Sequence, residues 1–269
     1  MFKLLCLVIF CLLNTDLYCK QDESKTSCEA ELRDCYSDRN SYRLSKYRDI
    51  YAIIGSPNTK IQVSLKYKIT SYFNLYLGYT QTMFWDIGKE SSPFKDISFN
   101  PDLFYSIDFP KDTFVKAIDI GIYEHESNGK DGLASRSWSG SYLKFYTIVR
   151  FNNWSFNWDT KLYWFYKFQL DNTNFDIREY SGFWNSRISF INYYESDEFV
   201  DRITFYFDFF AGGKYSQLLG KGAQELGVKF RMGAGPFYPC IFLQLYHGYN
   251  ESLLDYNVEL SSYRIGIAF

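Results

Sequence analysis

From about residue 47 to the C-terminus, apolar and polar side chains alternate along the chain with a period of two. In residues 73–85, large apolar side chains occupy most odd-numbered positions, whereas Asn, Gly and Thr occupy most even-numbered ones. Successive side chains of a strand point to opposite faces, so this period predicts β-strands. Segments with this pattern lie near residues 47–55, 59–69, 73–85, 99–109, 113–127, 139–151, 154–168, 179–193, 200–211, 222–232, 238–248 and 257–269. We therefore predict an all-β fold of about 12 strands, without a second domain.

Two architectures share this alternation: a transmembrane barrel with apolar side chains outside, and a soluble β-sandwich with apolar side chains inside. Aromatic residues make up 21% of the chain, which fits a membrane barrel with aromatic girdles at its two interfaces. The last alternating segment ends on Phe269, and a terminal aromatic residue is typical of outer-membrane barrels, where it serves as an assembly signal. No stretch reaches the roughly 18 apolar residues that a spanning helix needs. These features favour a transmembrane antiparallel up-and-down β-barrel over residues 47–269.

The interior of such a barrel would be narrow, because it has only about 12 strands. Polar side chains expected to point inward could fill it with a hydrogen-bonded network, which makes a conductive pore the less favoured interpretation. These side chains are Lys144, Arg150, Tyr206, Asp208 and Arg264. The net charge of -2 gives no support for a nucleic-acid partner.

The first 46 residues differ from the rest. Lys3 followed by the apolar run Leu4–Leu13 predicts a secretory signal peptide over residues 1–19, although no clear cleavage motif precedes Cys19. Residues 20–46 are charged and irregular, and we expect a periplasmic N-terminal segment there. Cys28 and Cys35 lie within it, but seven residues of regular helix would separate them by about 10 Å, too far for a disulfide. Either the segment is looped, or each cysteine pairs elsewhere, for example with Cys240 or with a Cys19 that has not been cleaved off.

Candidate chemistry is concentrated in residues 122–143. His125 and Ser127 would lie on the same face of a strand that ends at the Asn128-Gly129 turn signal, as a base and a nucleophile. If the following strand pairs Ser127 with Ser139, and so His125 with Ser141, then Ser139 is placed to orient the imidazole. The alternative is a polar hairpin loop with an ordinary half-exposed histidine, because a His-x-Ser spacing is a weak signal.

The strand that carries these residues does not keep one phase. Its apolar positions include Ile118, Ile120 and Ile122, whereas His125 and Ser127 have the opposite parity. A β-bulge near Gly121-Ile122 would shift the phase, because glycine within a strand often marks such an irregularity. We therefore expect an active site on the outer, lipid-facing surface, with Asp119 and Glu124 pointing inward.

The motifs resemble those of the bacterial outer-membrane phospholipase A family over most of the chain after about residue 45. The matching runs are His125-Glu126-Ser127-Asn128-Gly129, Ser135-Arg136-Ser137-Trp138, Gly78-Tyr79-Thr80-Gln81, Glu90-Ser91-Ser92-Pro93-Phe94, Glu225-Leu226-Gly227 and Gly248–Asn257. The resemblance implies a calcium-dependent outer-membrane phospholipase that hydrolyses phospholipid acyl esters and acts as a homodimer. By position it implies Ser127 as nucleophile, His125 as general base, and the backbone N–H of Gly129 as an oxyanion donor.

The same resemblance implies calcium ligands: the backbone carbonyl of Lys130, the hydroxyl of Ser135, and Ser91 from the second subunit. Gln81 lies on an otherwise apolar outward face. Its amide would either find a partner amide across the dimer axis or lie close enough to the membrane–water interface to be hydrated.

The chain departs from the family at Ser139, where the family has an asparagine that fixes the tautomer of the imidazole. This change leaves an alternative in which the protein is a catalytically impaired barrel with a structural, adhesive or pore role. Asp131 could replace the missing orienting group, and we expect the second histidine, His247, to be an interfacial side chain.

Overall fold

The computed structural model describes residues 44–269 except residues 111, 167–171, 195–198, 213–219 and 234–237. Its strands are β1 (Leu44–Lys46), β2 (Tyr51–Ser56), β3 (Thr59–Lys68), β4 (Leu75–Trp85), β5 (Phe94–Asp108), β6 (Val115–Ser127), β7 (Ser137–Phe151), β8 (Trp154–Phe165), β9 (Trp184–Tyr193), β10 (Val200–Phe210), β11 (Ala223–Met232), β12 (Cys240–Gly248) and β13 (Leu260–Ala268). The described helices are the single turns η2 (Gly132–Ala134) and α4 (Arg178–Ser181), so no helix in this part of the chain could cross a membrane.

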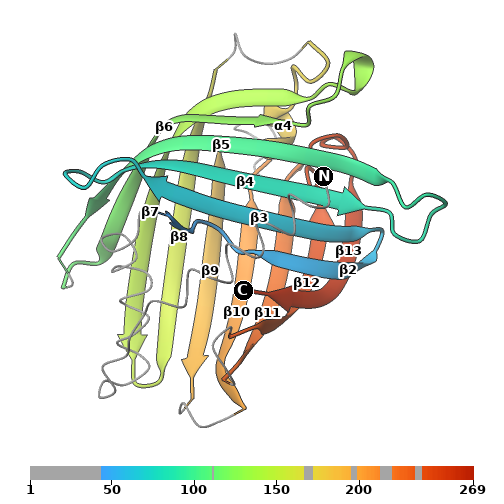
Figure 1. The fold of residues 1–269 in the computed structure, drawn as a ribbon. Coiled ribbons are helices and arrows are strands. Elements are labelled where there is room, and N and C mark those ends of the chain that lie inside the picture. The colour runs from blue at the N-terminus through green and yellow to red at the C-terminus, as the bar shows by residue number, and fades with distance from the viewer. Residues whose placement is uncertain (1–43, 111, 167–171, 195–198, 213–219, 234–237) are drawn as a thin grey trace.

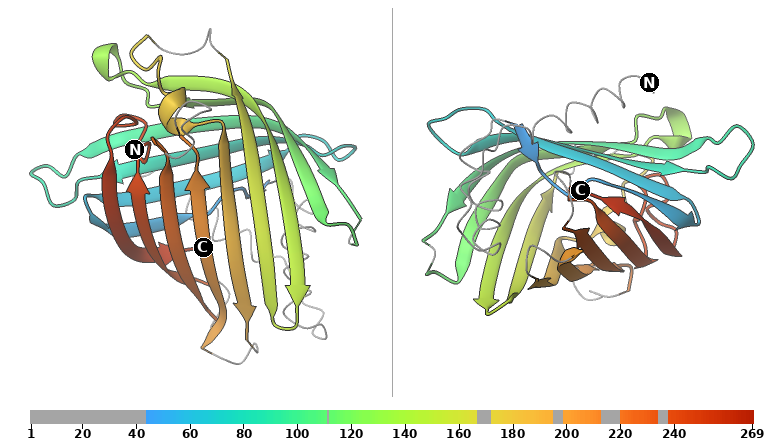
Figure 2. Two further views of the ribbon diagram at one scale, coloured as in Figure 1. Left: turned by 180° about the vertical axis from the view of Figure 1, so that it is seen from behind. Right: turned by 60° about the horizontal axis from the view of Figure 1, so that its bottom comes forward.

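The strands form one closed antiparallel sheet, in which each strand from β4 to β13 pairs with its neighbours in chain order. The barrel closes because β2 pairs with β13 on one side and with β3 on the other, while β3 also pairs with β4. β1 and β2 lie end to end against β3, as one interrupted strand. With β1 and β2 counted as one strand, twelve strands form the wall of the barrel, which confirms the predicted fold (Figures 1 and 2).

The described barrel begins at Leu44, three residues before the expected boundary at residue 47. The expected signal peptide and most of the N-terminal segment, with Cys28 and Cys35, lie outside the described residues. Cys240 is buried with a free thiol.

The outer surface of the barrel is apolar and the inner surface is polar. In β13, Tyr263, Ile265 and Ile267 are exposed, whereas Arg264 between them is 3% exposed. A soluble protein would expose the polar face instead, so the sense of the alternation fits lipid surroundings. The expected choice of barrel over sandwich is confirmed.

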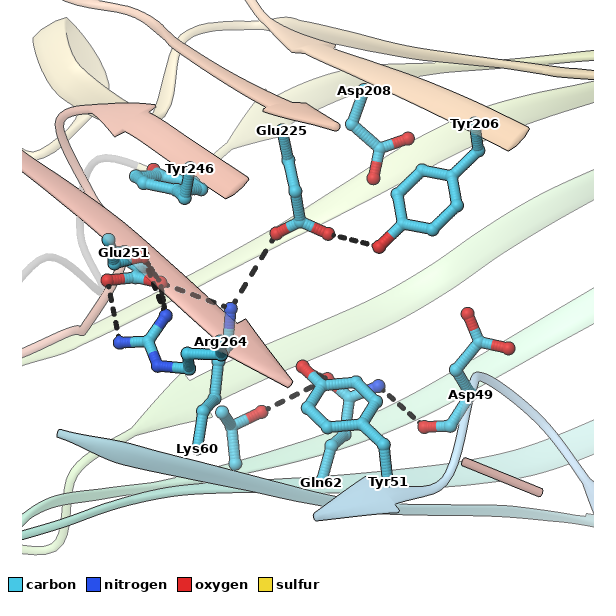
Figure 3. Close-up of polar contacts among 12 residues, drawn as sticks. Asp49, Tyr51, Lys60, Gln62, Tyr206, Asp208, Glu225, Tyr246, Glu251 and Arg264 are labelled. Atoms are coloured by element: carbon cyan, nitrogen blue, oxygen red, sulfur yellow. Dashed lines mark hydrogen bonds and ion pairs between the residues drawn. The ribbon is translucent and has the colours of Figure 1, made fainter. Parts of the chain in front are cut away.

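The interior is crossed by ion pairs and hydrogen bonds, several of which Figure 3 shows. Lys60 Nζ lies 3.7 Å from a carboxylate oxygen of Glu225 and 3.6 Å from one of Glu251, and Arg264 also pairs with Glu251. Tyr206 donates a hydrogen bond of 2.7 Å to Glu225. Of these residues, Lys60, Glu225 and Glu251 line a cavity of about 210 Å³.

Two more of the residues expected inside take part in similar contacts. Asp208 accepts two hydrogen bonds of 2.6 Å from Arg187, and Lys144 lies 3.8 Å from Asp159. The predicted polar network therefore occupies the barrel interior.

The residues between β1 and β2 turn into the barrel and reach several strands. Tyr47 donates a hydrogen bond of 2.5 Å to Asp102 on β5, and Arg48 pairs with Glu124 on β6 at 2.9 Å. Asp49 lies 2.5 Å from Lys229 on β11. The start of the barrel thus supports the strand that carries His125.

The connections at the two ends of the barrel differ in length. The connections that follow β2, β4, β6, β8, β10 and β12 belong to one end and span 2, 8, 9, 18, 12 and 11 residues, whereas those that follow β3, β5, β7, β9 and β11 belong to the other and span 6, 6, 2, 6 and 7 residues. In bacterial barrels the longer loops face the outside of the cell. The hairpin loop after Ser127 therefore belongs to the outer end.

Candidate active site

A β-bulge in β6 sets the direction of the candidate side chains. On β5, Leu103 pairs with Tyr123 and Phe104 pairs with Gly121, which leaves Ile122 as the extra residue. The pairing with β7 shifts at the same place, between Gly121 and Glu124. The bulge predicted at Gly121-Ile122 is therefore confirmed.

Gly121 has a packing reason to lack a side chain: a Cβ there would lie 2.1 Å from the ring of Tyr142. Asp119 before the bulge and Glu124 after it are 3% and 2% exposed and point inward, as expected. Tyr123, which precedes Glu124, is 40% exposed on the outer surface. His125 and Ser127 share the parity of Tyr123, which agrees with the expected outward direction.

The register of the hairpin differs from the predicted one by two residues. Ser127 pairs with Ser137 rather than with Ser139, and His125 pairs with Ser139 rather than with Ser141. The reason is the loop, because Asn128 closes it through hydrogen bonds to Ala134 and Arg136 and lets the strands pair closer to the turn. A shift of two keeps the facing of each side chain.

The corrected register brings Ser139 directly opposite His125. The Oγ atom of Ser139 lies 2.8 Å from Nδ1 of the imidazole, within hydrogen-bond distance. On the other side of β6, the amide of Asn100 donates a hydrogen bond of 2.8 Å to the backbone carbonyl of His125. Ser139 on β7 thus holds the imidazole, Asn100 on β5 holds the backbone of His125, and Nε2 is left to face away from Ser139.

Ser127 ends the strand, and its hydroxyl accepts a hydrogen bond of 3.2 Å from the backbone N–H of Gly129. Gly129 has φ +63°, and a Cβ there would lie 3.2 Å from the ring of Phe99. Both the conformation and the space therefore favour glycine. The geometry puts a backbone donor beside the hydroxyl, where a negative oxygen would form during acyl transfer.

The loop 128–136 contains two of the three expected metal ligands, Lys130 and Ser135. The side chain of Asn128 is 4% exposed and accepts hydrogen bonds from the backbone N–H groups of Lys130 and Arg136. Ser91 lies in a different connection, between β4 and β5, with φ +62°. The described ranges contain no group of three or more His, Cys, Asp or Glu side chains placed to hold a metal, and the three expected ligands offer neutral oxygen atoms.

A carbonyl and a hydroxyl are suitable donors for calcium, which prefers oxygen ligands. Two such donors from one chain leave the coordination shell incomplete. The donor set therefore fits calcium only together with water or oxygen atoms from a second subunit.

Two inward-pointing carboxylates support the strand from behind, and sequence reasoning gave neither Glu124 nor Glu126 this role. Glu124 pairs with Lys161 at 2.7 Å in addition to Arg48, and Glu126 accepts a hydrogen bond of 3.0 Å from the indole of Trp138. The shifted parity of the strand was the signal that could have identified both.

Three other expectations concern residues around the site. Asp131 is exposed, and its side chain does not cap η2. The partner of Nδ1 of His125 in this structure is Ser139, whose orienting role Asp131 was expected to take. His247 lies on the outer surface with 67% of its side chain exposed, 2.9 Å from Ser261. Gln81 accepts a hydrogen bond of 3.3 Å from Tyr79, so its carbonyl has a partner within the chain.

Comparison with known proteins gives consistent matches. The family model for phospholipase A1 matches residues 34–269. Phospholipase A1 of Escherichia coli K12 is 28% identical over 241 residues, which cover 86% of this chain and 75% of the relative. Phospholipase A1 of Klebsiella pneumoniae is 29% identical over 241 residues, covering 86% and 76%.

Solved structures match the fold as well. Outer membrane phospholipase A from Escherichia coli superposes with a TM-score of 0.66 at 22% identity, over 84% of this chain and 94% of that chain. The Salmonella typhi outer membrane phospholipase dimer with bound calcium gives a TM-score of 0.66 at 23% identity, over 86% and 94%.

Proposed function

Because the chain belongs to the phospholipase A1 family, we propose that it is a calcium-dependent outer-membrane phospholipase that hydrolyses phospholipid acyl esters. Its substrates would be phospholipids, cleaved at either acyl ester bond, and lysophospholipids, cleaved at the remaining one. The observation that carries the proposal is the contact between Ser139 and His125 on the outer surface, next to Ser127. A phospholipid in the outer leaflet could present its carbonyl there without leaving the membrane.

In the proposed reaction, the oxygen of Ser127 attacks the ester carbonyl while Nε2 of His125 takes the hydroxyl proton. Ser139 holds Nδ1, so that Nε2 keeps the lone pair that a base needs. The backbone N–H of Gly129 donates to the developing oxyanion. The imidazole returns its proton to the leaving alcohol, and water then attacks the acyl-enzyme with His125 again as base.

The proposed calcium site consists of the Lys130 carbonyl and the Ser135 hydroxyl, with Ser91 contributed by a second subunit. A bound calcium ion would add positive charge near the oxyanion. A homodimer would then be the active form. The amide N–H₂ of Gln81, whose carbonyl already accepts from Tyr79, is the group offered to the partner across an apolar interface.

The alternative is a barrel of the same fold with impaired catalysis. Two observations favour it: Ser139 stands where the resembled family has asparagine, and Ser127 hydrogen-bonds to Gly129 rather than to His125 in the described structure. Catalytic hydrogen bonds are often long or absent before substrate binds, which leaves the enzyme as the better-supported function.

The decisive experiment measures release of fatty acid from a short-chain phospholipid by refolded protein in detergent micelles, with calcium or with a chelator. We expect calcium-dependent release that falls by roughly 10⁴-fold or more in Ser127→Ala. The matched control is Ser261→Ala, because Ser261 also contacts a histidine on the outer surface. Release that survives in Ser127→Ala would contradict the proposed nucleophile.

A Ser139→Asn variant separates the two functions. An increase in turnover would show that the serine is a weak orienting group in a working enzyme. Release that appears only in this variant would identify the parent protein as the impaired barrel.

A further inference from the structure

The hydroxyl of Ser139 has two partners. One is Nδ1 of His125 at 2.8 Å, and the other is the phenolic oxygen of Tyr123 at 3.2 Å. The ring of Tyr123 lies parallel to the imidazole, with the centroids 6.5 Å apart and an interplanar angle of 6°. Ser139 itself is 1% exposed, so its hydrogen-bonding needs are met by these two groups rather than by solvent.

A serine in this place raises a problem that an amide carbonyl does not. A hydroxyl has one hydrogen to donate and two lone pairs that accept, and it can rotate between these roles. If Ser139 donates to Nδ1 of His125, the imidazole carries its proton on Nε2 and cannot accept one from Ser127. Only when Ser139 accepts from Nδ1–H is the imidazole a base toward Ser127.

The hydrogen of Ser139 therefore needs an acceptor other than His125. The phenolic oxygen of Tyr123 is the described side-chain acceptor within reach. The phenol is 40% exposed, so its own hydrogen can point to water or to a lipid head group. The ring of Tyr123 also stacks with that of Tyr166, with the centroids 6.4 Å apart and an interplanar angle of 23°.

We propose that Tyr123 is a positioning residue that sets the tautomer of His125 by accepting the Ser139 hydrogen. The catalytic consequence of this inference rests on the proposed function, in which His125 is the general base. The bulge at Ile122 sets the face on which Tyr123 and His125 both lie, and His125 pairs there with Ser139.

The first test reads the tautomer directly and needs no turnover. The chain has two histidines, so ¹⁵N-histidine labelling in micelles gives two imidazole signals, and His247→Asn assigns them. At a pH where the imidazole is neutral, we expect the Nδ1–H form in the parent protein. Tyr123→Phe, which keeps the ring and removes the oxygen, should shift His125 toward the Nε2–H form.

The control for this measurement is Tyr166→Phe, which removes a neighbouring hydroxyl that contacts Ser141 instead. It should leave the tautomer of His125 unchanged. The same tautomer in the parent and in Tyr123→Phe would overturn the proposal, as would an Nε2–H form in the parent.

The second test is kinetic. Tyr123→Phe should lower kcat roughly fivefold to tenfold with KM unchanged, because that factor corresponds to the net free energy of one hydrogen bond. In a Ser139→Ala background the same substitution should cause no further loss, because the hydroxyl it acts through is gone. Equal losses in both backgrounds would show that Tyr123 acts by packing alone. An inactive parent would contradict the proposed function, whereas the tautomer measurement would still decide the role of Tyr123.

Discussion

Replacing Glu124 with glutamine should destabilise the barrel more than any change on its outer surface. The carboxylate is 2% exposed and pairs with Arg48 at 2.9 Å and with Lys161 at 2.7 Å. In Glu124→Gln the Lys161 ammonium, with 7% of its side chain exposed, would remain in the interior without a carboxylate. Removing one partner of a buried pair costs roughly 3–5 kcal/mol.

We expect the lower end of this range, about 3 kcal/mol. The reason is that 37% of the Arg48 side chain is exposed, so water can solvate it. Lys161 also keeps two aromatic partners, since its Nζ lies 3.7 Å from the centroid of the Tyr142 ring and 4.6 Å from that of Tyr163.

The assay is equilibrium unfolding in urea, in detergent micelles, followed by tryptophan fluorescence. Glu259→Gln is the control, because that carboxylate is 54% exposed and should change the free energy of unfolding by less than about 0.5 kcal/mol. The double variant Glu124→Gln/Lys161→Met should recover part of the loss, because it removes the unpaired ammonium. The reasoning fails if Glu124→Gln unfolds within about 1 kcal/mol of the parent, or if the double variant is less stable than the single one.

Three further predictions concern the site and the outer loops. Gly129→Ala should lower kcat, because its φ of +63° costs a side chain about 1–2 kcal/mol and the new Cβ would press on Phe99; unchanged kcat in the micelle assay would contradict this. Deleting Ile122 makes Gly121 and Tyr123 consecutive, so the other residues keep their pairing and their faces, and we expect the protein to fold and to retain hydrolysis; loss of hydrolysis with heat-modifiable migration intact on gels would contradict this. Burial alone would raise the pKa of the Glu251 carboxyl, but Lys60 and Arg264 together outweigh burial and hold that pKa below its ordinary value. Because this pKa is lower in the folded state, the ionised carboxylate stabilises the fold above the unfolded pKa of about 4.3, and that stabilisation is lost as the pH falls below it. The urea midpoint should therefore drop between pH 5 and pH 3 less steeply in Glu251→Gln than in the parent.

The strands of this barrel could be predicted from sequence because each one carries its own signal. Alternation in β13, with Arg264 between Tyr263 and Ile265, needs no knowledge of its neighbours. The bulge was equally local, since the apolar parity changes at Gly121-Ile122 within a single strand. Features of this kind follow from the period of the backbone and survive errors elsewhere.

The register of the catalytic hairpin could not be predicted in the same way. It depends on how the loop closes, and the loop closes through the buried side chain of Asn128, which bonds to backbone groups six and eight residues later. The interior partners of Glu124 were out of reach for a related reason, because Arg48 lies 76 residues earlier in the chain and Lys161 lies 37 later. Such contacts depend on the closed barrel rather than on any local pattern.

The bulge connects these two levels. If Ile122 paired as an ordinary strand residue, one phase would run through the whole of β6, and Asp119 and His125 would face the same side. With the bulge, the strand presents Asp119 and Glu124 to the interior and Tyr123, His125 and Ser127 to the lipid side. On the inner side, Glu124 forms ion pairs that anchor this segment of β6. On the outer side of the same segment, His125 contacts Ser139. A polar interior is thus more than a filler for a narrow barrel, because it fixes the backbone on which an outward-facing catalytic group depends.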